Sequence, residues 1–221
     1  MEKVGVFAFG RTGSQRCPNK MLRPFGETTL TDIILRKLAQ IPAYTFFAGL
    51  EPEFEAKCDD AGVRFVQRDE RSATIDEPIR EILSFLEEVP CEHLLIVNGC
   101  LPFLRVETIN RFLEDCQQGG HEPAFGVVRR TNHFLTLDRQ ALNFDISSPT
   151  INTKTVKPVL EFAHALYFFS RDYFLTEGRY WDWQTVRLVE MAGGLELLDI
   201  DTEEDFALAE SLWRGDPLAL S

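Results

Sequence analysis

The sequence predicts an α/β fold built on a doubly wound, mixed and mostly parallel sheet. Short apolar runs of strand length alternate with segments of helical hydrophobic spacing along most of the 221 residues. Such alternation is typical of a parallel sheet covered by helices. The first apolar run, residues 4–9, leads directly into a loop rich in glycine and cations, which is where open α/β sheets bind ligands. With 44% hydrophobic residues the chain suffices for one sizeable domain, and we expect residues 1–221 to form a single unit.

The later strands and helices are expected from the spacing of apolar residues. Strands are predicted where apolar and β-prone residues lie between turn formers, at residues 44–50, 64–67, 94–97, 124–128 and 163–169. Helices are predicted where apolar residues recur three and four positions apart, at residues 30–38, 54–61, 76–88 and 106–118. The run at 94–97 is the most apolar of all, which is typical of a central strand buried on both faces.

The C-terminal stretch 195–210 is predicted to form a strand, a turn and a helix. Thr202 and Asp205 have the spacing of a capping box at the helix start. Two-residue spacing places Asp199 and Asp201 on the same side of the strand end. Two close carboxylates form a hard oxygen site suited to Mg²⁺. Acidic residues before a helix also interact favourably with its dipole, so this alternative stays open.

Residues 129–158 interrupt the alternation of strands and helices. This segment has no sustained periodicity, several turn formers and only short β-prone pieces. We therefore expect an excursion from the main sheet between the strand at 124–128 and the strand at 163–169.

Charge and cysteine usage exclude several classes of protein. A formal net charge of -12 argues against a nucleic-acid or anionic-membrane partner, since those partners need a basic surface. The five cysteines are odd in number and show no C-x-x-C spacing, which favours reduced thiols over a disulfide framework or a zinc site. The N-terminus shows no basic-then-apolar leader, and no apolar run is long enough to span a membrane. We expect a cytoplasmic protein.

The loop at residues 11–20 has the chemistry of a polyphosphate site. Gly13 allows the backbone to approach a ligand closely, so that main-chain N–H groups can point at phosphate oxygens. Arg11 and Arg16 offer planar forks for two oxygens, and Lys20 offers a mobile point charge. The alternative is an ordinary basic surface loop after a first strand.

At this loop the chain resembles a known family. The pattern R-x-G-S-x-R-x-P-x-K is filled here by Arg11, Gly13, Ser14, Arg16, Pro18 and Lys20. It is similar to the signature of the cytidylyltransferases that activate acidic sugars, among them the CMP-sialic acid, CMP-KDO and spore-coat polysaccharide enzymes. The C-terminal D-x-D-T-x-x-D-x-x-x-A-E, beginning at Asp199, resembles that family's metal-binding motif, and residues 65–68 resemble its F-x-x-R.

The resemblance implies a fold, a reaction and roles for particular residues. The implied fold is a three-layer, Rossmann-like sheet of the nucleotide-diphosphosugar transferase type, assembled as a homodimer through the excursion. The implied reaction moves CMP from CTP to an acidic sugar, sialic-acid-like or KDO-like, with release of pyrophosphate. Catalytic roles fall to Arg16, Lys20 and Asp201, and Mg²⁺ would be held by Asp199 and Asp201. Nucleotide contacts are implied for Arg11, Gly13, Ser14, Gln15, Arg68 and Asn98.

Several residues depart from the family pattern. Cys100 stands where KDO-activating relatives carry a metal-binding Asp, Gln15 where sialic-acid relatives often have Lys, and Met21 where Asn is usual. Two alternatives follow: a nucleotidyltransferase for another base or a non-acidic sugar, and a nucleotide-sugar-binding relative without turnover. His164 either contacts an acceptor or fills the core, and the aromatic residues 180–183 are assigned no chemistry.

Overall fold

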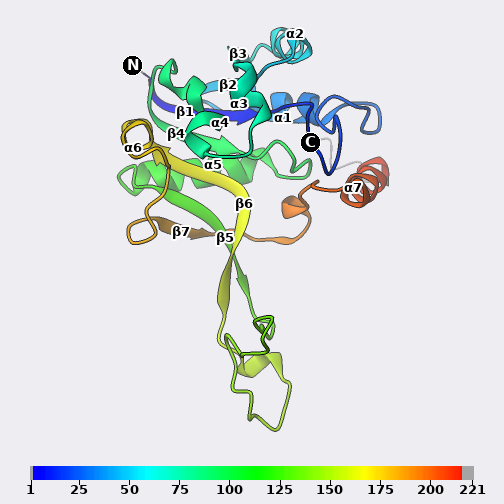
Figure 1. The fold of residues 1–221 in the computed structure, drawn as a ribbon, viewed down its shortest axis with the longest axis vertical. Helices are drawn as coiled ribbons and strands as arrows, with labels where there is room; N and C mark the ends of the chain where they lie inside the picture. Colours follow the sequence, from blue (N-terminus) through cyan, green and yellow to red (C-terminus); the bar gives the residue numbers. More distant parts are fainter. Residues whose placement is uncertain (1, 216–221) are drawn as a thin grey trace.

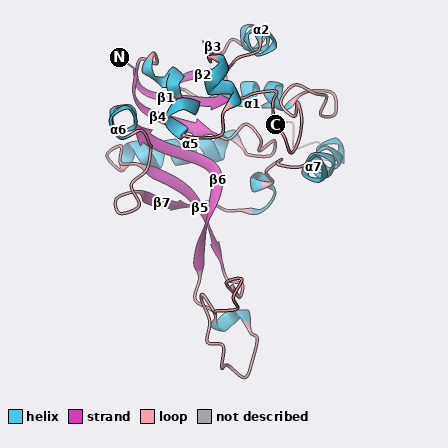
Figure 2. Cartoon of the chain, in the orientation of Figure 1, coloured by secondary structure: helices cyan, strands magenta, loops and turns pink. Residues whose placement is uncertain are grey.

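The computed structural model describes residues 2–215, and within them the chain forms one seven-stranded sheet with the order β3-β2-β1-β4-β6-β5-β7 (Figures 1 and 2). The strands are β1 (Glu2–Phe9), β2 (Tyr44–Gly49), β3 (Arg64–Gln67), β4 (Cys91–Val97), β5 (Ala124–Arg130), β6 (Val159–Ser170) and β7 (Arg187–Glu190). Strand β6 runs antiparallel to both of its neighbours, whereas the other strand pairs are parallel. The predicted doubly wound, mixed and mostly parallel sheet is confirmed.

Helices cover both faces of the sheet. They are α1 (Leu30–Leu38), α2 (Pro52–Ala61), α3 (Glu70–Thr74), α4 (Ile79–Ile82), α5 (Val106–Gln118), α6 (Arg171–Glu177) and α7 (Glu203–Gly215). Two of them begin at the capping boxes that the sequence contains. Thr29 and Asp32 cap α1, and Thr202 and Asp205 exchange side-chain and backbone hydrogen bonds before α7.

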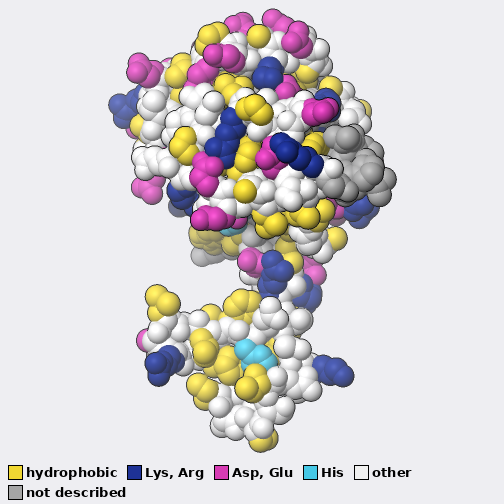
Figure 3. All heavy atoms as spheres, turned by 90° about the vertical axis from the view of Figure 1, so that its right-hand side faces the viewer, with side chains coloured by type: hydrophobic (Ala, Val, Ile, Leu, Met, Phe, Trp, Pro, Cys, Tyr) yellow, Lys and Arg dark blue, Asp and Glu magenta, His cyan; other side chains and the backbone are white. Residues whose placement is uncertain are grey.

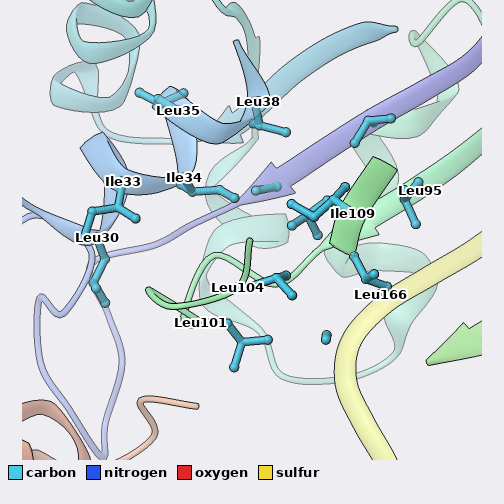
Figure 4. Packing of buried hydrophobic residues seen from close by; sticks show 14 of the residues in the cluster. Leu30, Ile33, Ile34, Leu35, Leu38, Leu95, Leu101, Leu104, Ile109 and Leu166 are labelled. Carbon is cyan, nitrogen blue, oxygen red and sulfur yellow. The ribbon is translucent and has the colours of Figure 1, made fainter. Parts of the chain in front are cut away.

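Two hydrophobic clusters fill the space between the sheet and its helices. In the first, the apolar stripe of α1 meets α5 and the sheet, and Figure 4 shows Ile34 on the side of α1 that faces Ile109. The second cluster joins the opposite face of the sheet to α4, α6 and the turn at residues 84–87. Because side chains alternate along a strand, β1 sends Val6 to the first cluster and Phe7 to the second. The result is three layers.

Two local expectations are wrong, and some elements were not expected. The helix expected at 76–88 breaks into α4 and a 3-10 turn at Ser84–Glu87, because Leu83 leaves helical geometry at φ -108° and ψ 25°. Pro78, which lacks an N–H donor, lies at the start of α4 rather than inside it. The strand expected at the start of the stretch 195–210 is replaced by a 3-10 turn at Gly194–Leu197, and β7, α3 and α6 were not expected. Within the described part of the chain, no helix is long and apolar enough to cross a membrane.

The segment between β5 and β6 projects from the body as an arm, which we define as residues 131–158 (Figure 1). Strands β5 and β6 continue as a two-stranded ribbon to the pair Arg130 and Val159, from which the arm extends. Asn143 holds the arm together, because its buried amide donates to the carbonyls of Asn132 and Lys157 at 2.8 Å each. Figure 3 shows hydrophobic side chains gathered on the arm's surface.

Arg68 is a buried cation at the end of β3. Its side chain is 2% exposed, and its guanidinium donates to Ser72 Oγ at 3.1 Å and to the Gly10 carbonyl at 3.1 Å. The same group donates to the carbonyls of Ser72 and Ile82. Burial lowers the pKa of Arg68 to about 10, which still leaves it charged at neutral pH. Arg68 therefore ties the loop after β1 to the segment carrying α3 and α4.

We expect the substitution Arg68→Met to lower the free energy of unfolding by roughly 3 kcal/mol, since it leaves several buried carbonyl groups without a donor. Urea denaturation measures the change. The control is Arg64→Met, which alters an exposed arginine on the same strand and should cost less than about 1 kcal/mol. Equal effects for the two variants would contradict the structural role of Arg68.

Candidate active site

The loop between β1 and α1 is anchored at both ends. The Gly10 N–H donates to the Ala48 carbonyl at 3.0 Å, and a Cβ on Gly10 would lie 2.9 Å from the ring of Phe47. The Thr12 N–H donates to Glu51 Oε1 at 3.1 Å, and the Thr12 carbonyl accepts from the Asn19 N–H at 3.0 Å. These bonds fold residues 11–20 over the carboxyl end of β1.

A cavity of about 530 Å³ lies under this loop. Its lining includes most of the sequence-predicted site residues, namely Arg11, Ser14, Gln15, Arg16, Lys20, Arg68 and Asp201. Gly13 does not line it, but a Cβ added there would meet no atom within 4 Å, so there is open space beside this part of the loop. Arg68 reaches the cavity wall while its nitrogens are bonded within the protein, so direct contact with a nucleotide stays a prediction for this residue.

Two cations of the loop meet the turn before α7. Arg16 Nη2 donates to Asp201 Oδ1 at 3.0 Å, and Lys20 Nζ lies 3.7 Å from the same oxygen. Lys20 Nζ also donates to the Ile200 carbonyl. The Arg16 side chain is 69% exposed whereas that of Lys20 is 12% exposed, so Arg16 has freedom to move and Lys20 is held in place. On the face shown in Figure 3, Lys and Arg side chains lie beside Asp and Glu.

Arg11 lines the same cavity as these two cations. Its guanidinium donates to the Ile75 carbonyl at 3.0 Å and pairs with Asp76. Asp76 is a partner that no sequence signal identifies, because the spacing of apolar residues predicts a continuous helix at 76–88. The predicted phosphate-binding cations therefore lie along one cavity, each beside a carboxylate or a carbonyl.

A second cavity of about 430 Å³ adjoins the first and shares Phe9, Ile79, Cys100 and Asp201 with it. Its other lining residues are Ile96, Val97, Asn98, Gly99, His164, Tyr167, Tyr180 and Asp199. The sequence suggested Asn98 and Asp199 for the site and left His164 open between an acceptor contact and the core, and the structure places His164 exposed in this cavity. It assigned no chemistry to Tyr180, since clustered aromatic residues more often belong to a core. The two cavities form one crevice at the carboxyl ends of β1 and β4.

Asp199 is a buried carboxylate without full hydrogen bonding. Asn98 Nδ2 donates to Asp199 Oδ2 at 3.0 Å, whereas Asp199 Oδ1 is buried and has no hydrogen-bond partner. Burial, followed by the nearby charge of Asp201, raises the pKa of the Asp199 carboxyl. An unpartnered, buried carboxylate oxygen next to a second carboxylate fits a hard divalent cation.

The residues present suit Mg²⁺ better than a softer metal. Within the described residues no cluster of three or more His, Cys, Asp or Glu side chains has metal-binding geometry. Magnesium commonly uses one or two carboxylates together with water and phosphate oxygens, so Asp199 and Asp201 would suffice. Burial raises the pKa of the Cys100 thiol to about 11, which keeps it protonated and makes it a poor ligand for this ion.

Comparisons with known proteins agree with this architecture. Residues 10–174 match the family model described as MobA-like NTP transferase domain. Among solved structures, the chain is similar to CMP:2-keto-3-deoxy-manno-octonic acid synthetase complexed with CTP, with a TM-score of 0.71, 14% identity and coverage of 96% of this chain and 99% of that one. A search of curated proteins finds no match of comparable significance.

Two further solved structures share the fold. One is 4-diphosphocytidyl-2C-methyl-D-erythritol synthase from Anaerococcus prevotii, with a TM-score of 0.66, 12% identity and coverage of 96% of both chains. The other is a cytidylyltransferase from Leptospira borgpetersenii, with a TM-score of 0.63, 14% identity and coverage of 100% of this chain and 97% of that one. At these identities the likeness establishes the fold.

We expect Asp199→Asn to stabilise the protein in the presence of a chelator by roughly 1 kcal/mol, because it removes a buried, incompletely bonded charge. The folded-state pKa of Asp199 lies above its unfolded value, so ionising this group costs stability at neutral pH, and the cost fades as pH falls through the folded-state value. Urea denaturation at neutral and mildly acidic pH tests both statements.

Asp201→Asn is the matched control, since it removes the carboxylate that pairs with Arg16 and Lys20 and should bring no gain in stability. A loss of stability in Asp199→Asn would show that this carboxylate is a structural anchor, contrary to its unpartnered oxygen.

Proposed function

The chain belongs to the MobA-like NTP transferase domain family, and we propose from this premise that it transfers CMP from CTP to a sugar hydroxyl and releases pyrophosphate. One observation carries the proposal. The crevice brings the cations Arg16 and Lys20 together with the carboxylate Asp201, which lies more than 180 residues further along the chain. Nucleotidyl transfer needs this pairing, because positive groups must face the phosphates while a metal ligand lies beside them.

The reaction is an in-line displacement at the α-phosphorus. The sugar hydroxyl oxygen forms the new bond to phosphorus, the bond to the bridging oxygen of pyrophosphate breaks, and the hydroxyl proton leaves to solvent. Arg16 and Lys20 would stabilise the charge that builds up on the departing pyrophosphate. Lys20 is already held in place by the Ile200 carbonyl, so little reorganisation is needed at that side of the site. The more exposed Arg16 can turn from Asp201 to the phosphates.

We propose Mg²⁺ as the cofactor, held by Asp199 and Asp201. When bound, the ion would offset the negative charge on the non-bridging oxygens of the α-phosphate. Asn98 would orient Asp199 through its hydrogen bond to Oδ2, which leaves Oδ1 available for the ion. The support for this proposal is the donor chemistry of these two carboxylates.

The choice of CTP rests on the loop pattern and on the solved neighbours, of which one is a complex with CTP and another is a cytidylyltransferase. For the acceptor, the motifs favour an acidic sugar. The second cavity favours a non-acidic one, because its lining contains carboxylates, aromatic rings and amides but no Lys or Arg. A neutral sugar is therefore the second candidate for the acceptor.

We also propose that the arm mediates a homodimer. Its apolar side chains are unusually exposed for a monomer, with Leu137 at 107%, Ile151 at 88% and Ile146 at 69%. The arm has little hydrophobic core of its own, and the hydrogen bonds of Asn143 hold it together. A second copy of the chain would cover the exposed apolar residues.

The reaction is tested by screening CTP, UTP, ATP and GTP against acidic and neutral sugars for pyrophosphate release. We expect turnover with CTP above the other nucleotides, and a roughly 100-fold or greater loss in Lys20→Met, typical of losing one transition-state contact. Lys57→Met is the matched control, because Lys57 also forms an ion pair, with Asp32, but lies outside the crevice. Turnover of Lys20→Met within about threefold of the wild type would remove the loop from the mechanism.

The assembly is tested by light scattering at micromolar concentration. We expect a dimer, and we expect the double variant Leu137→Glu and Ile151→Glu to be monomeric, since charges would then lie in the apolar surface of the arm. Leu208→Glu on α7 is the control, as this exposed leucine lies outside the arm and its change should leave the dimer intact. A monomeric wild type would contradict the role of the arm.

A further inference from the structure

His164 has an unfavourable backbone in the middle of a strand. Its φ is 49°, in the left-handed region that favours glycine. The residue lies where the pairing of β5 and β6 is interrupted, because Phe125 pairs with Tyr167 while Val127 pairs with Phe162. Extra residues on one strand form a bulge, and bulges near active sites often redirect a side chain. Strain of this kind persists only where the surroundings hold it, and it concentrates at functional sites.

Asn98 holds the bulge in place. The Asn98 N–H donates to the Ala165 carbonyl at 2.9 Å, and Asn98 Nδ2 donates to the His164 carbonyl at 2.8 Å. Asn98 also donates to Asp199 at 3.0 Å, so the same residue positions the bulge and one of the proposed metal ligands. The position of His164 is therefore coupled, through Asn98, to that of Asp199.

The imidazole of His164 lines the second cavity with one nitrogen already oriented. Nδ1 lies 2.8 Å from the hydroxyl of Tyr167, which is also in the cavity wall. Burial raises the pKa of the Tyr167 hydroxyl, so this group keeps its proton. His164 Nε2 makes no hydrogen bond to any residue that the structure describes. An exposed ring with one fixed and one free nitrogen is suited to bind a ligand.

We propose that His164 determines acceptor specificity by hydrogen-bonding a hydroxyl group of the sugar through Nε2, an assignment that rests on the proposed transfer reaction. A hydroxyl group donates and accepts, so it suits either tautomer of a histidine whose other nitrogen is bound by a tyrosine. The lining of this cavity contains no Lys or Arg, which favours a neutral partner over an anionic one at this position. The bulge in β6, with its unfavourable φ at His164, places this ring in the cavity wall.

Two variants separate this role from a purely structural one. His164→Gly suits the positive φ better than histidine does, and His164→Asn retains a polar group in a residue type that tolerates this region. His121→Gly is the matched control, since His121 also has a positive φ, of 65°, but packs beside His93 and Phe168, outside the crevice. The wild type and the three variants are compared by thermal unfolding, calorimetry with CTP, and pyrophosphate release at saturating CTP with the most active sugar.

We expect His164→Gly to have a Tm equal to or above that of the wild type, to bind CTP within about twofold, and to lose roughly tenfold or more in kcat/KM for the sugar. The kcat/KM of His164→Asn for the sugar should lie between those of His164→Gly and the wild type. His121→Gly should keep the kcat/KM of the wild type. Sugar kcat/KM within about threefold of the wild type in both His164 variants would overturn the assignment. A parallel loss of Tm, CTP binding and turnover would also overturn it, by showing a structural role. If the wild type turned over no sugar, the proposed function itself would fail, and this assignment with it.

Discussion

The contact between the loop after β1 and the turn before α7 is the constraint on which the site depends. Lys20 bonds the Ile200 carbonyl and, with Arg16, faces Asp201. In the free protein these charges largely neutralise one another. A triphosphate in the crevice would compete with Asp201 for these cations and would place its phosphates beside Asp201 and the incompletely bonded Asp199. Carboxylates and phosphates repel each other, so a divalent cation between them resolves the conflict. In the proposed mechanism, Asp201 balances the cations of the free site and would join Asp199 in holding a metal ion once a triphosphate is bound.

The antiparallel strand β6 belongs both to the wall of the second cavity and to the ribbon that carries the arm. It lies between β4 and β5, and it passes the carboxyl end of β4 where Asn98 bonds the carbonyls of His164 and Ala165. Beyond that point β6 pairs with β5 as the ribbon that carries the arm. One strand therefore contributes a wall of the second cavity and the base of the exposed apolar surface.

The sequence predicted the elements whose patterns are local and strong. Residues 64–67 and 106–118 form a strand and a helix with the expected bounds, and the C-terminal capping box forms as expected. Predictions failed where tertiary contacts decide the outcome. Strand β7 has four residues, half of them charged, and is a strand only because β5 lies beside it. The resemblance implied roles in one reaction for Arg16, Lys20 and Asp201, and these three residues line one cavity. The burial of Arg68 and the positive φ of His164 depend on packing partners far along the chain, which residue spacing does not reveal.

The central claim, that one triphosphate and one metal ion lie between the loop and the acids, is tested most directly by a crystal structure with a non-hydrolysable CTP analogue and Mn²⁺, located by its anomalous signal. We expect a single Mn²⁺ peak in contact with carboxylate oxygens of Asp199 and Asp201 and with an α-phosphate oxygen, with Arg16 and Lys20 on the phosphates. A triphosphate bound away from residues 11–20, or a metal ion that contacts neither carboxylate, would contradict it.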